Sequence, residues 1–378
     1  MIFALLMAAM TLAVTWTIAT IPAIATIPAI ASLPLGVSVP QDKHQDPQVQ
    51  AALRSYRTKV WICGILTTLL TLAAWKWPIV AAFSSLIVVV GAMFSYVTAR
   101  RRIIDAKAAG KWYDEVETAI STRITRTSFT ESQLAGLKTT VRFPWISVLG
   151  SLLVTAVGAI VVAMRWDNIP ETIPTHWGAG LQPDAWSDKS VPSVFIGTFV
   201  SLGLIALFAV IFWAMAAFPS HSRNDRSIKG QLRNDAILAA SNEGIGLLLL
   251  AMCVPLTIDQ IAGPLPEFSD WLPVGFYGLL LCSILGVIAL LVLIALRASQ
   301  LDDALRGVSF PDEGKESPDN DEHYKWGMFY YNPDDPAVLV DKRFGVGVTF
   351  NFATWQAKAF MAFILLVTVV LCALPALA

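Results

Sequence analysis

The sequence predicts an all-α integral membrane protein, a bundle of about eight transmembrane helices with a small cytoplasmic β-hairpin module before the last helix. The first observation is composition: 55% of the 378 residues are hydrophobic and only 15% are charged, whereas a soluble domain averages about 25% charged residues. The second is a series of apolar runs of membrane-spanning length. The third is the concentration of lysine and arginine in alternate segments between those runs.

A helix needs roughly 20 apolar residues to cross about 30 Å of hydrocarbon. Eight runs qualify, and tryptophans lie near many of their ends, where amphipathic rings prefer the membrane interface. Because no basic segment precedes the first run, we expect it to be retained rather than cleaved as a signal peptide. The expected spans are residues 1–21, 60–77, 78–97, 145–164, 192–214, 241–260, 272–296 and 358–377.

The basic residues predict the orientation of these spans, because lysine and arginine concentrate on the cytoplasmic side. With the N-terminus and the C-terminus outside, 24 of the 27 basic residues are cytoplasmic. Only Lys76, Arg165 and Lys189 then lie outside. The segments predicted to be cytoplasmic are residues 22–59, 98–144, 215–240 and 297–358. The expected location is the bacterial cell membrane.

The spans divide the chain into six segments. We expect the basic stretch after the third span to form a helix, either along the membrane surface or as a solvated continuation of that span. The segments are 1–59, the first helix and a Pro-rich cytoplasmic stretch; 60–144, a helical hairpin and the basic stretch; 145–214, a transmembrane pair with the outer loop 165–191; 215–296, a cytoplasmic loop and a transmembrane pair; 297–357, a cytoplasmic linker and the β-hairpin module; and 358–378, the last helix.

The outer loop contains an individual stretch, IPTHWGAGLQPDAWSDKS at residues 173–190. His176, Asp184 and Asp188 form its titratable cluster, but a metal site needs three or four convergent ligands at recognisable spacing. The alternative is structural: the loop must return the chain with its backbone groups paired. As a ligand-binding hypothesis, we select His176, Trp177, Gly180, Asp184, Trp186 and Lys189.

The cytoplasmic module follows an acidic stretch, residues 310–323, that is typical of a linker. The pattern predicts strands at 328–331 and 337–340, joined by the turn signal Asn-Pro-Asp-Asp-Pro at 332–336. Two Gly-Val-x-Val stretches, at 35–40 and 344–349, also favour short strands. The candidate partner surface comprises Trp326, Tyr330, Tyr331, Asn332, Asp335, Lys342 and Arg343.

Patterns of known catalytic sites are missing: the sequence has no GxSxG, Walker A or GxGxxG motif. The four cysteines lie inside apolar runs and are interpreted as buried hydrophobic residues. We therefore expect no enzyme, no cofactor and no metal. Glu243, near the start of the sixth span, is the intramembrane acid candidate, because an acid within a span is a functional hypothesis by default. Depending on where the span starts, Glu243 lies at its cytoplasmic edge, which the flanking residues favour, or about one turn inside.

Two stretches resemble a known bacterial family. IPETIPTHWGAGLQPDAWSDKS resembles the extracytoplasmic domain of unknown function found in the SdpI-like family, named for a multi-pass immunity protein against a secreted toxin. WGMFYYNPDDPAVLVDKRFGVGVTFN resembles a second domain of unknown function found at the C-terminus of such proteins. The resemblance implies protection against a membrane-active peptide, with signalling to a cytoplasmic regulator.

Three functions follow as hypotheses. The first is a receptor or immunity protein whose partners are the lipid bilayer, a secreted peptide outside and a regulator inside, with no nucleic acid. The second is a transporter or its accessory subunit, which needs a polar path between helices. The third is a metal-dependent membrane enzyme built on His176 and Asp184.

Overall fold

A computed structural model describes residues 8, 11–12, 15–16, 18–19, 33–74, 76–114, 116, 140–178, 181–218, 228–308, 319–343 and 347–377. The chain forms two compact units. Unit 1 comprises Met1–Arg126, Ser220–Gln231 and Ser309–Ala353, and unit 2 comprises Thr127–Pro219, Leu232–Val308 and Thr354–Ala378.

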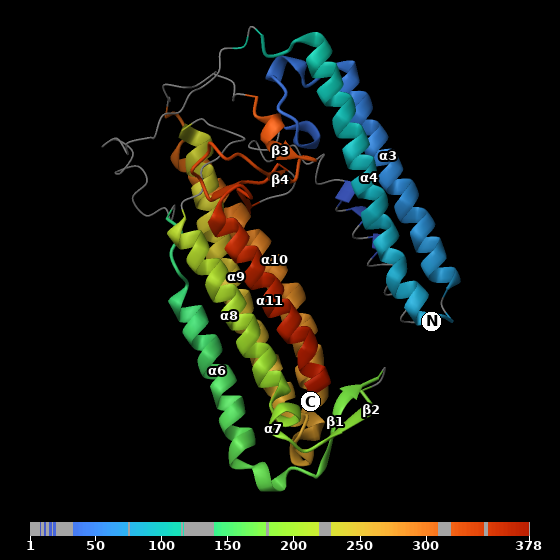
Figure 1. The fold of residues 1–378 in the computed structure, drawn as a ribbon, viewed down its shortest axis with the longest axis vertical. Coiled ribbons are helices and arrows are strands. Elements are labelled where there is room, and N and C mark those ends of the chain that lie inside the picture. Colours follow the sequence, from blue (N-terminus) through green and yellow to red (C-terminus); the bar gives the residue numbers. More distant parts are fainter. Residues whose placement is uncertain are drawn as a thin grey trace. The chain divides into compact units, whose positions relative to one another are not determined.

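Unit 2 is a helical bundle with a small β-hairpin at one end (Figure 1). Its helices are α6 (Trp145–Met164), α7 (Val191–Val194), α8 (Ile196–Ala217), α9 (Ile228–Ala262), α10 (Leu272–Ala304) and α11 (Trp355–Leu377). The hairpin end also holds the 3-10 helices η4 (Trp166–Asn168) and η5 (Pro266–Trp271), and strands β1 (Thr172–Trp177) and β2 (Pro183–Asp188). Ser190 caps α7 by accepting from the Ser193 backbone N–H at 3.2 Å.

The protein is membrane-embedded, because four helices in the described residues are long and apolar enough to cross a bilayer. They are Trp145–Met164, Ile196–Ala217, Lys229–Ala262 and Pro266–Ala304, with a shorter apolar helix at Trp355–Val370. This number is lower than the eight spans predicted from the sequence. One reason is local: α3 ends at Ala73, so the run at 60–77 keeps only about 14 helical residues, or ~21 Å. The run at 1–21 lies largely outside the described residues.

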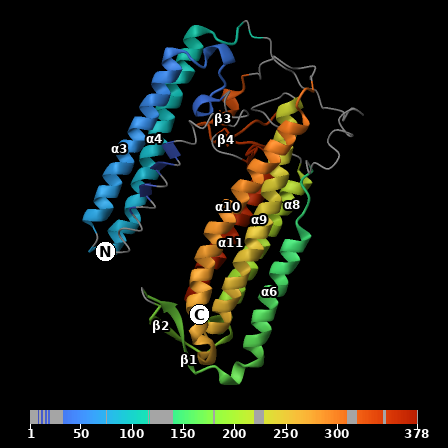
Figure 2. The same ribbon diagram turned by 180° about the vertical axis from the view of Figure 1, so that it is seen from behind.

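In unit 1, helices α3 (Pro47–Ala73) and α4 (Pro78–Gly110) lie side by side as a hairpin (Figure 2). Asp46 caps α3, because its side chain accepts from the Gln48 N–H at 2.8 Å. The single helix α4 confirms that the basic stretch begins as a continuation of the third apolar run. Residues 117–139 lie outside the described residues.

The prediction of a short strand at residues 35–40 is wrong. This stretch contains the 3-10 helix η2 (Pro34–Gly36) and then an extended segment without a strand partner among the described residues, followed by η3 (Gln41–Lys43). The alternation of apolar residues in this stretch nevertheless predicts correctly which side chains are buried. Leu35, Val37 and Val39 join the core of the α3–α4 pair, where their apolar side chains contact it instead of a sheet.

The module predicted to be cytoplasmic has four strands among the described residues: β3 (Tyr324–Lys325), β4 (Phe329–Tyr330), β5 (Leu339–Asp341) and β6 (Val348–Phe350), preceded by η6 (Asp321–His323). The predicted pairing of 328–331 with 337–340 is wrong. Instead β4 pairs with β3, and β5 pairs with β6, both antiparallel. The reason is that Asn351 binds the carbonyls of Asn332 and Asp335 at 2.8 and 2.9 Å. These bonds hold the 332–336 turn against β6 rather than closing a hairpin.

Candidate functional site

The outer loop of the sequence analysis is a two-stranded β-hairpin. Strands β1 and β2 pair antiparallel from Thr172 and Asp188 to Trp177 and Pro183, with irregular register around His176. At the tip, the Gly178 N–H donates to the Gln182 carbonyl at 2.9 Å. The structural requirement of the loop, paired backbone groups, is therefore met by strand pairing.

The root of the hairpin is fixed to unit 2 by an apolar cluster. Ile169 and Ile173 are buried with Val162, Val194 and Leu265, which come from α6, α7 and the loop before η5. Trp166 stacks on Phe195 with ring centroids 6.3 Å apart and planes at 7°. A rigid root supports a tip that projects from the bundle end.

The side chains nearest the tip are exposed. His176 Nδ1 and Asp184 Oδ1 form a hydrogen-bonded pair whose side chains are 69% and 51% exposed. Trp186, on the neighbouring strand, is 58% exposed. An exposed tryptophan beside an exposed polar pair is typical of a binding surface, because Trp is enriched among the few interface residues that contribute most of the binding free energy. Gly180 lies outside the described residues.

Two other residues of the predicted ligand set have structural contacts. Lys189 Nζ donates to the Ile169 carbonyl at 3.0 Å and lies 5.2 Å from the centroid of the Trp166 ring. Trp177 is half-buried, and its ring lies 3.4 Å from the position of a Cβ built on Gly263. Both side chains therefore contact the bundle end rather than projecting with the hairpin tip.

The intramembrane acid candidate has a partner. Glu243 on α9 lies 3.6 Å from the Arg297 guanidinium on α10, measured from Oε2 to Nη2. In contrast, Asp259, near the other end of α9, has a buried Oδ1 without a hydrogen-bond partner among the described residues. It faces the backbone of Gly275, where no side chain could be added without displacing it.

The described residues of the hairpin supply only part of the ligand set that the metal hypothesis requires. Among the described residues, no group of three or more His, Cys, Asp or Glu side chains converges as a metal site requires. His176 and Asp184 supply two ligands, and Asp188 pairs through its backbone with Thr172 at the opposite end of the hairpin.

The predicted cytoplasmic surface separates into an exposed and a buried part. Trp326, Tyr331 and Lys342 are exposed, and Asn332 is half-buried. The other three are buried: Tyr330, Asp335 and Arg343. Tyr330 donates from its hydroxyl to Asp335 Oδ2 at 2.7 Å, so this pair stabilises the turn from inside and is not accessible to a partner.

Arg343 belongs to a buried ion cluster that the sequence analysis did not identify. Asp321 is its centre: Arg343 Nη1 donates to Oδ1 at 2.6 Å, the Ser38 N–H donates to the same oxygen at 3.0 Å, and Lys107 Nζ donates to Oδ2. Arg100 Nη2 lies 4.0 Å from Oδ1. The cluster therefore joins four distant chain segments: the extended stretch after η2, α4, η6 and the end of β5.

The cluster also organises backbone groups. Arg100 donates to the Gly36 and Leu35 carbonyls, and Arg343 donates to Ser38 Oγ at 2.8 Å and to Asn320 Oδ1. Gly36 has φ +67°, and a Cβ there would lie 2.8 Å from the Tyr96 hydroxyl. A glycine is required at this position because both the conformation and the space exclude a side chain.

Burial alone would raise the pKa of the Asp321 carboxyl, but Arg343, Lys107 and the Ser38 N–H hold it below its usual range. Burial lowers the pKa of the Arg100 guanidinium, which nevertheless stays charged because an arginine pKa starts far above neutrality. Asp321 and Arg100 therefore carry opposite charges at neutral pH.

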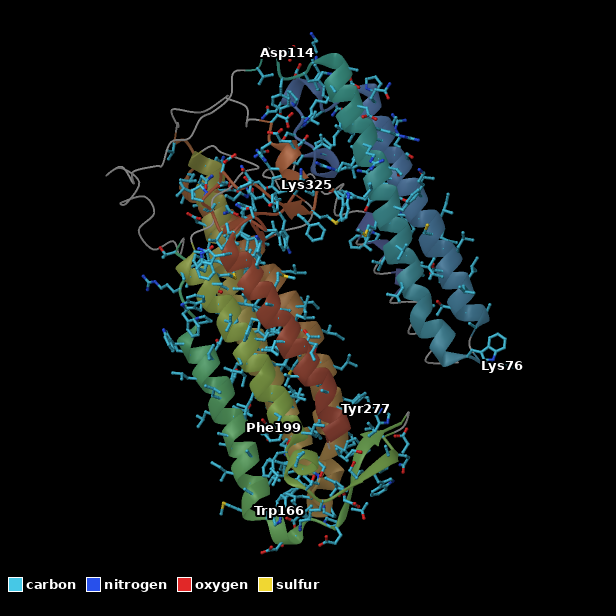
Figure 3. The ribbon with its side chains drawn as sticks, viewed as in Figure 1. Lys76, Asp114, Trp166, Phe199, Tyr277 and Lys325 are labelled. Carbon is cyan, nitrogen blue, oxygen red and sulfur yellow. The ribbon has the colours of Figure 1, made fainter. Side chains whose placement is uncertain are left out.

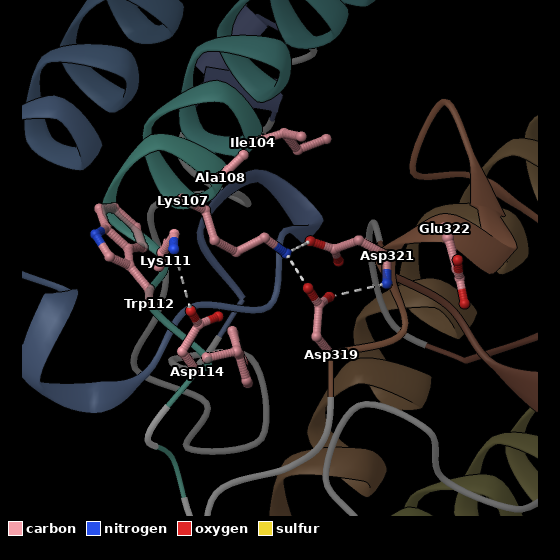
Figure 4. A pocket seen from close by; sticks show the side chains of 10 residues that line it. Ile104, Lys107, Ala108, Lys111, Trp112, Asp114, Asp319, Asp321 and Glu322 are labelled. Atoms are coloured by element: carbon pink, nitrogen blue, oxygen red, sulfur yellow. Dashed lines mark hydrogen bonds and ion pairs between the residues drawn. The ribbon is translucent and has the colours of Figure 1, made fainter.

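A cavity of about 440 Å³ opens beside the cluster (Figure 4). Lys107 points across it to Asp319, with Nζ and Oδ2 2.8 Å apart, and to Asp321. Lys111 and Asp114 face each other at 4.0 Å on the same side. Because its basic groups already face acidic groups, the cavity does not present a net anion site.

Sequence reasoning missed this cluster because its members carry misleading local signals. Arg100 stands in an Arg-Arg-Arg run that indicates the cytoplasmic end of a span, and Asp319 and Asp321 stand in the acidic stretch interpreted as a linker. Nothing in either segment indicates burial. One signal in the sequence could have been used. A basic residue such as Arg343, in a motif with acidic residues nearby, requires a charged partner if it is buried.

Two family models match parts of the chain. Residues 153–202, which include the whole β1–β2 hairpin, match a domain of unknown function, DUF1648. Residues 333–358, from the module turn to the start of α11, match a family of unknown function, DUF5808. No curated protein and no solved structure matches the chain. The chain therefore contains two domains of unknown function, which are consistent with an SdpI-like family.

Proposed function

We propose that this chain is a receptor or immunity protein of the bacterial cell membrane, and that the β1–β2 hairpin contacts a secreted membrane-active peptide. One observation carries the proposal: a rigidly rooted hairpin displays an exposed His176–Asp184 pair and an exposed Trp186 at the end of an apolar bundle. Exposed ion pairs contribute only about 0–1 kcal/mol to stability. The His176–Asp184 pair therefore contributes little to the stability of the fold, and we infer that its role is to contact a ligand.

In this proposal α3 and α4 also lie in lipid, in addition to the four long apolar helices described above. The reason is that both helices expose large apolar side chains. Such a face is costly in water and is normal in hydrocarbon. The exposed side chains are Trp61, Ile62, Ile65, Leu66, Leu69, Leu70 and Leu72 on α3, and Leu86, Ile87, Val89, Val90, Met93 and Phe94 on α4. With α11 and the run at 1–21, the total returns to about eight spans.

The orientation follows from charge and from the ends of unit 2. The C-terminal helix α11 contacts α7, at the bundle end that carries the hairpin (Figure 1). The hairpin and the C-terminus therefore share one side of the bundle. The distribution of basic residues supports an orientation with that side outside and the module inside. In this arrangement Tyr331 and Lys342, both exposed, are accessible to a cytoplasmic regulator.

A survival assay tests the proposal. A deletion strain is challenged with a panel of secreted membrane-active peptides and complemented with wild type, His176→Ala, Asp184→Asn or Gln182→Ala. We expect wild type and Gln182→Ala to restore survival, because the Gln182 side chain is an exposed neighbour at the tip. His176→Ala and Asp184→Asn are expected to lose at least tenfold in survival while retaining membrane expression.

Equal survival of the deletion strain and every complemented strain would remove the immunity role. Equal rescue by wild type and all three variants would keep the protective role but show that it does not depend on the hairpin.

A further inference from the structure

We propose that the aromatic edge of the cytoplasmic module, formed by Trp326, Phe329 and Phe352, inserts into the headgroup region of the inner leaflet. The partner is the lipid surface of the membrane that holds the helices. This inference rests on the membrane placement of α4 given under the proposed function. It assigns the module a direct lipid contact rather than a surface reserved for a protein.

The three rings form one continuous edge. Trp326 and Phe329 meet edge to face with centroids 6.1 Å apart, and Phe329 meets Phe352 at 5.7 Å. Trp326 is 61% exposed and Phe329 is 43% exposed. Tryptophan is enriched at the membrane interface because its ring is apolar but carries a polar N–H, and Phe329 and Phe352 extend the apolar surface beside Trp326. Lys325, beside them, is also exposed and would face anionic headgroups.

The backbone at this edge is unfavourable for a purely structural tryptophan. Trp326 has φ +54° and Gly327 has φ +73°, and the Met328 N–H donates to the Lys325 carbonyl at 3.1 Å. This is a tight turn of the type that prefers Asn-Gly at its centre. A bulky residue with positive φ costs free energy, and because Trp326 is 61% exposed, its burial within the protein offsets only part of that cost. A contact outside the chain would offset that cost.

The depth of the edge is set by α4. The Tyr96 hydroxyl donates to the Gly327 carbonyl at 3.4 Å, and a Cβ built on Gly327 would lie 2.9 Å from Arg100 Nε. The apolar run of α4 covers residues 78–97, about 20 residues or ~30 Å, which is the thickness of the hydrocarbon. Tyr96 and Arg100 therefore mark the level at which α4 leaves the lipid, and the turn lies at that level.

Figure 3 shows Lys76 near one end of the α3–α4 hairpin and Asp114 near the other, with Lys325 toward the Asp114 end.

The chain supplies a second depth marker. Phe352 is three residues before Trp355, the first residue of α11, and three peptide units span at most ~11 Å. Trp355 is 73% exposed and begins an apolar helix. If α11 enters the lipid at Trp355, as proposed, this length of chain keeps Phe352 within the same distance of the membrane surface.

The test measures lipid contact at position 326 in the full chain. The four native cysteines are replaced by alanine, and Trp326→Cys, Glu322→Cys and Val90→Cys are each labelled with an environment-sensitive fluorophore. The proteins are reconstituted in vesicles of phosphatidylcholine and phosphatidylglycerol, with or without lipids that carry a nitroxide quencher near the headgroup. For the Val90 label the nitroxide is on the acyl chain, because Val90 lies ~9 Å deeper along α4 than Tyr96. A parallel series uses a water-soluble quencher.

Glu322 is the matched control, because it is an exposed residue of the same module on the rim of the cavity with Lys107. Lys107 lies two turns, or ~10 Å, beyond Arg100 along α4. We expect the label at 326 to be quenched several-fold more by the lipid nitroxide than the label at 322. The water-soluble quencher should show the reverse order.

Equal quenching of both labels by the water-soluble reagent would overturn the inference, and so would a label at 326 that neither reagent reaches, because a protein would then cover the edge. The label at Val90, 68% exposed on α4, separates the two proposals. If Val90 is not quenched by lipid, the membrane placement of α4 fails and the inference fails with it. If only 326 is not quenched, the placement stands and the inference alone is overturned.

Discussion

Replacement of Asp321 with asparagine is expected to destabilise unit 1 by about 3–5 kcal/mol, the usual cost of removing one partner from a buried ion pair. Asp321 is the buried acid that faces Arg343, Lys107 and Arg100. The amide retains the size of the carboxylate but removes its negative charge, so Arg343 and Arg100 lose the carboxylate that they share, while Lys107 keeps Asp319 as a charged partner. Hydrogen exchange of residues 33–43 in the full chain should increase, because the cluster anchors that segment through the Ser38 N–H.

Asp319→Asn is the matched control for this experiment. Asp319 has a side chain that is 36% exposed and binds the Lys107 ammonium at 2.8 Å, so its loss is expected to cost about 1 kcal/mol or less. Wild-type exchange rates in Asp321→Asn would show that the cations are compensated by other groups, and the assignment of Asp321 as the centre would be wrong.

The same cluster predicts a pH dependence with a definite sign. Because the pKa of Asp321 is held below its usual range, the carboxylate stabilises the folded state at every pH above the ordinary aspartate value of about 4. This stabilisation is lost as pH falls through the lower, folded-state pKa. The protection factor of residues 33–43, which is the intrinsic exchange rate at each pH divided by the observed rate, should therefore be constant from neutral pH down to about 4 and fall below it. In Asp321→Asn this acid step should disappear, and a step that persisted would point to another carboxyl.

Replacement of Asn351 with leucine is expected to cost about 3 kcal/mol, because several buried backbone groups would lose their partner at once. Asn351 is fully buried. Its amide donates to the carbonyls of Asn332 and Asp335, and its Oδ1 accepts from the N–H groups of Asn332 and Ala353 at 3.1 and 3.2 Å. Leucine fills the volume but satisfies none of these groups.

The measurement for Asn351 is limited proteolysis of the full chain in detergent, with cleavage at the 332–336 turn as the readout. Asn332→Leu is the control: Asn332 is half-buried, and its side chain bonds the Asp334 N–H at 3.0 Å and the Tyr330 hydroxyl at 3.3 Å. We expect rapid cleavage in Asn351→Leu and a smaller increase in Asn332→Leu. Similar cleavage in both variants would contradict the prediction, because the local hydrogen bonds of Asn332 would then stabilise the turn as much as those of Asn351.

The sequence by itself determined the membrane class, the approximate positions of the long helices and the two individual motifs. Apolar runs and basic flanks are properties of local composition, and lipid selects them without reference to distant residues. The turn at 332–336 could also be read locally, because Asn, Asp and Pro restrict the backbone around themselves. The β1–β2 hairpin lay within a loop recognised as special, although its strands were not predicted.

Only the tertiary structure decided which residues of those motifs are accessible. The partners of Asp321 lie as far away as Ser38 and Lys107, and no local pattern shows that three cations converge on one carboxylate. Strand pairing in the module likewise depended on Asn351, which competes for the turn that the sequence assigned to a hairpin. Burial and pairing are decided by contacts between distant segments, whereas composition reports only what each segment prefers alone.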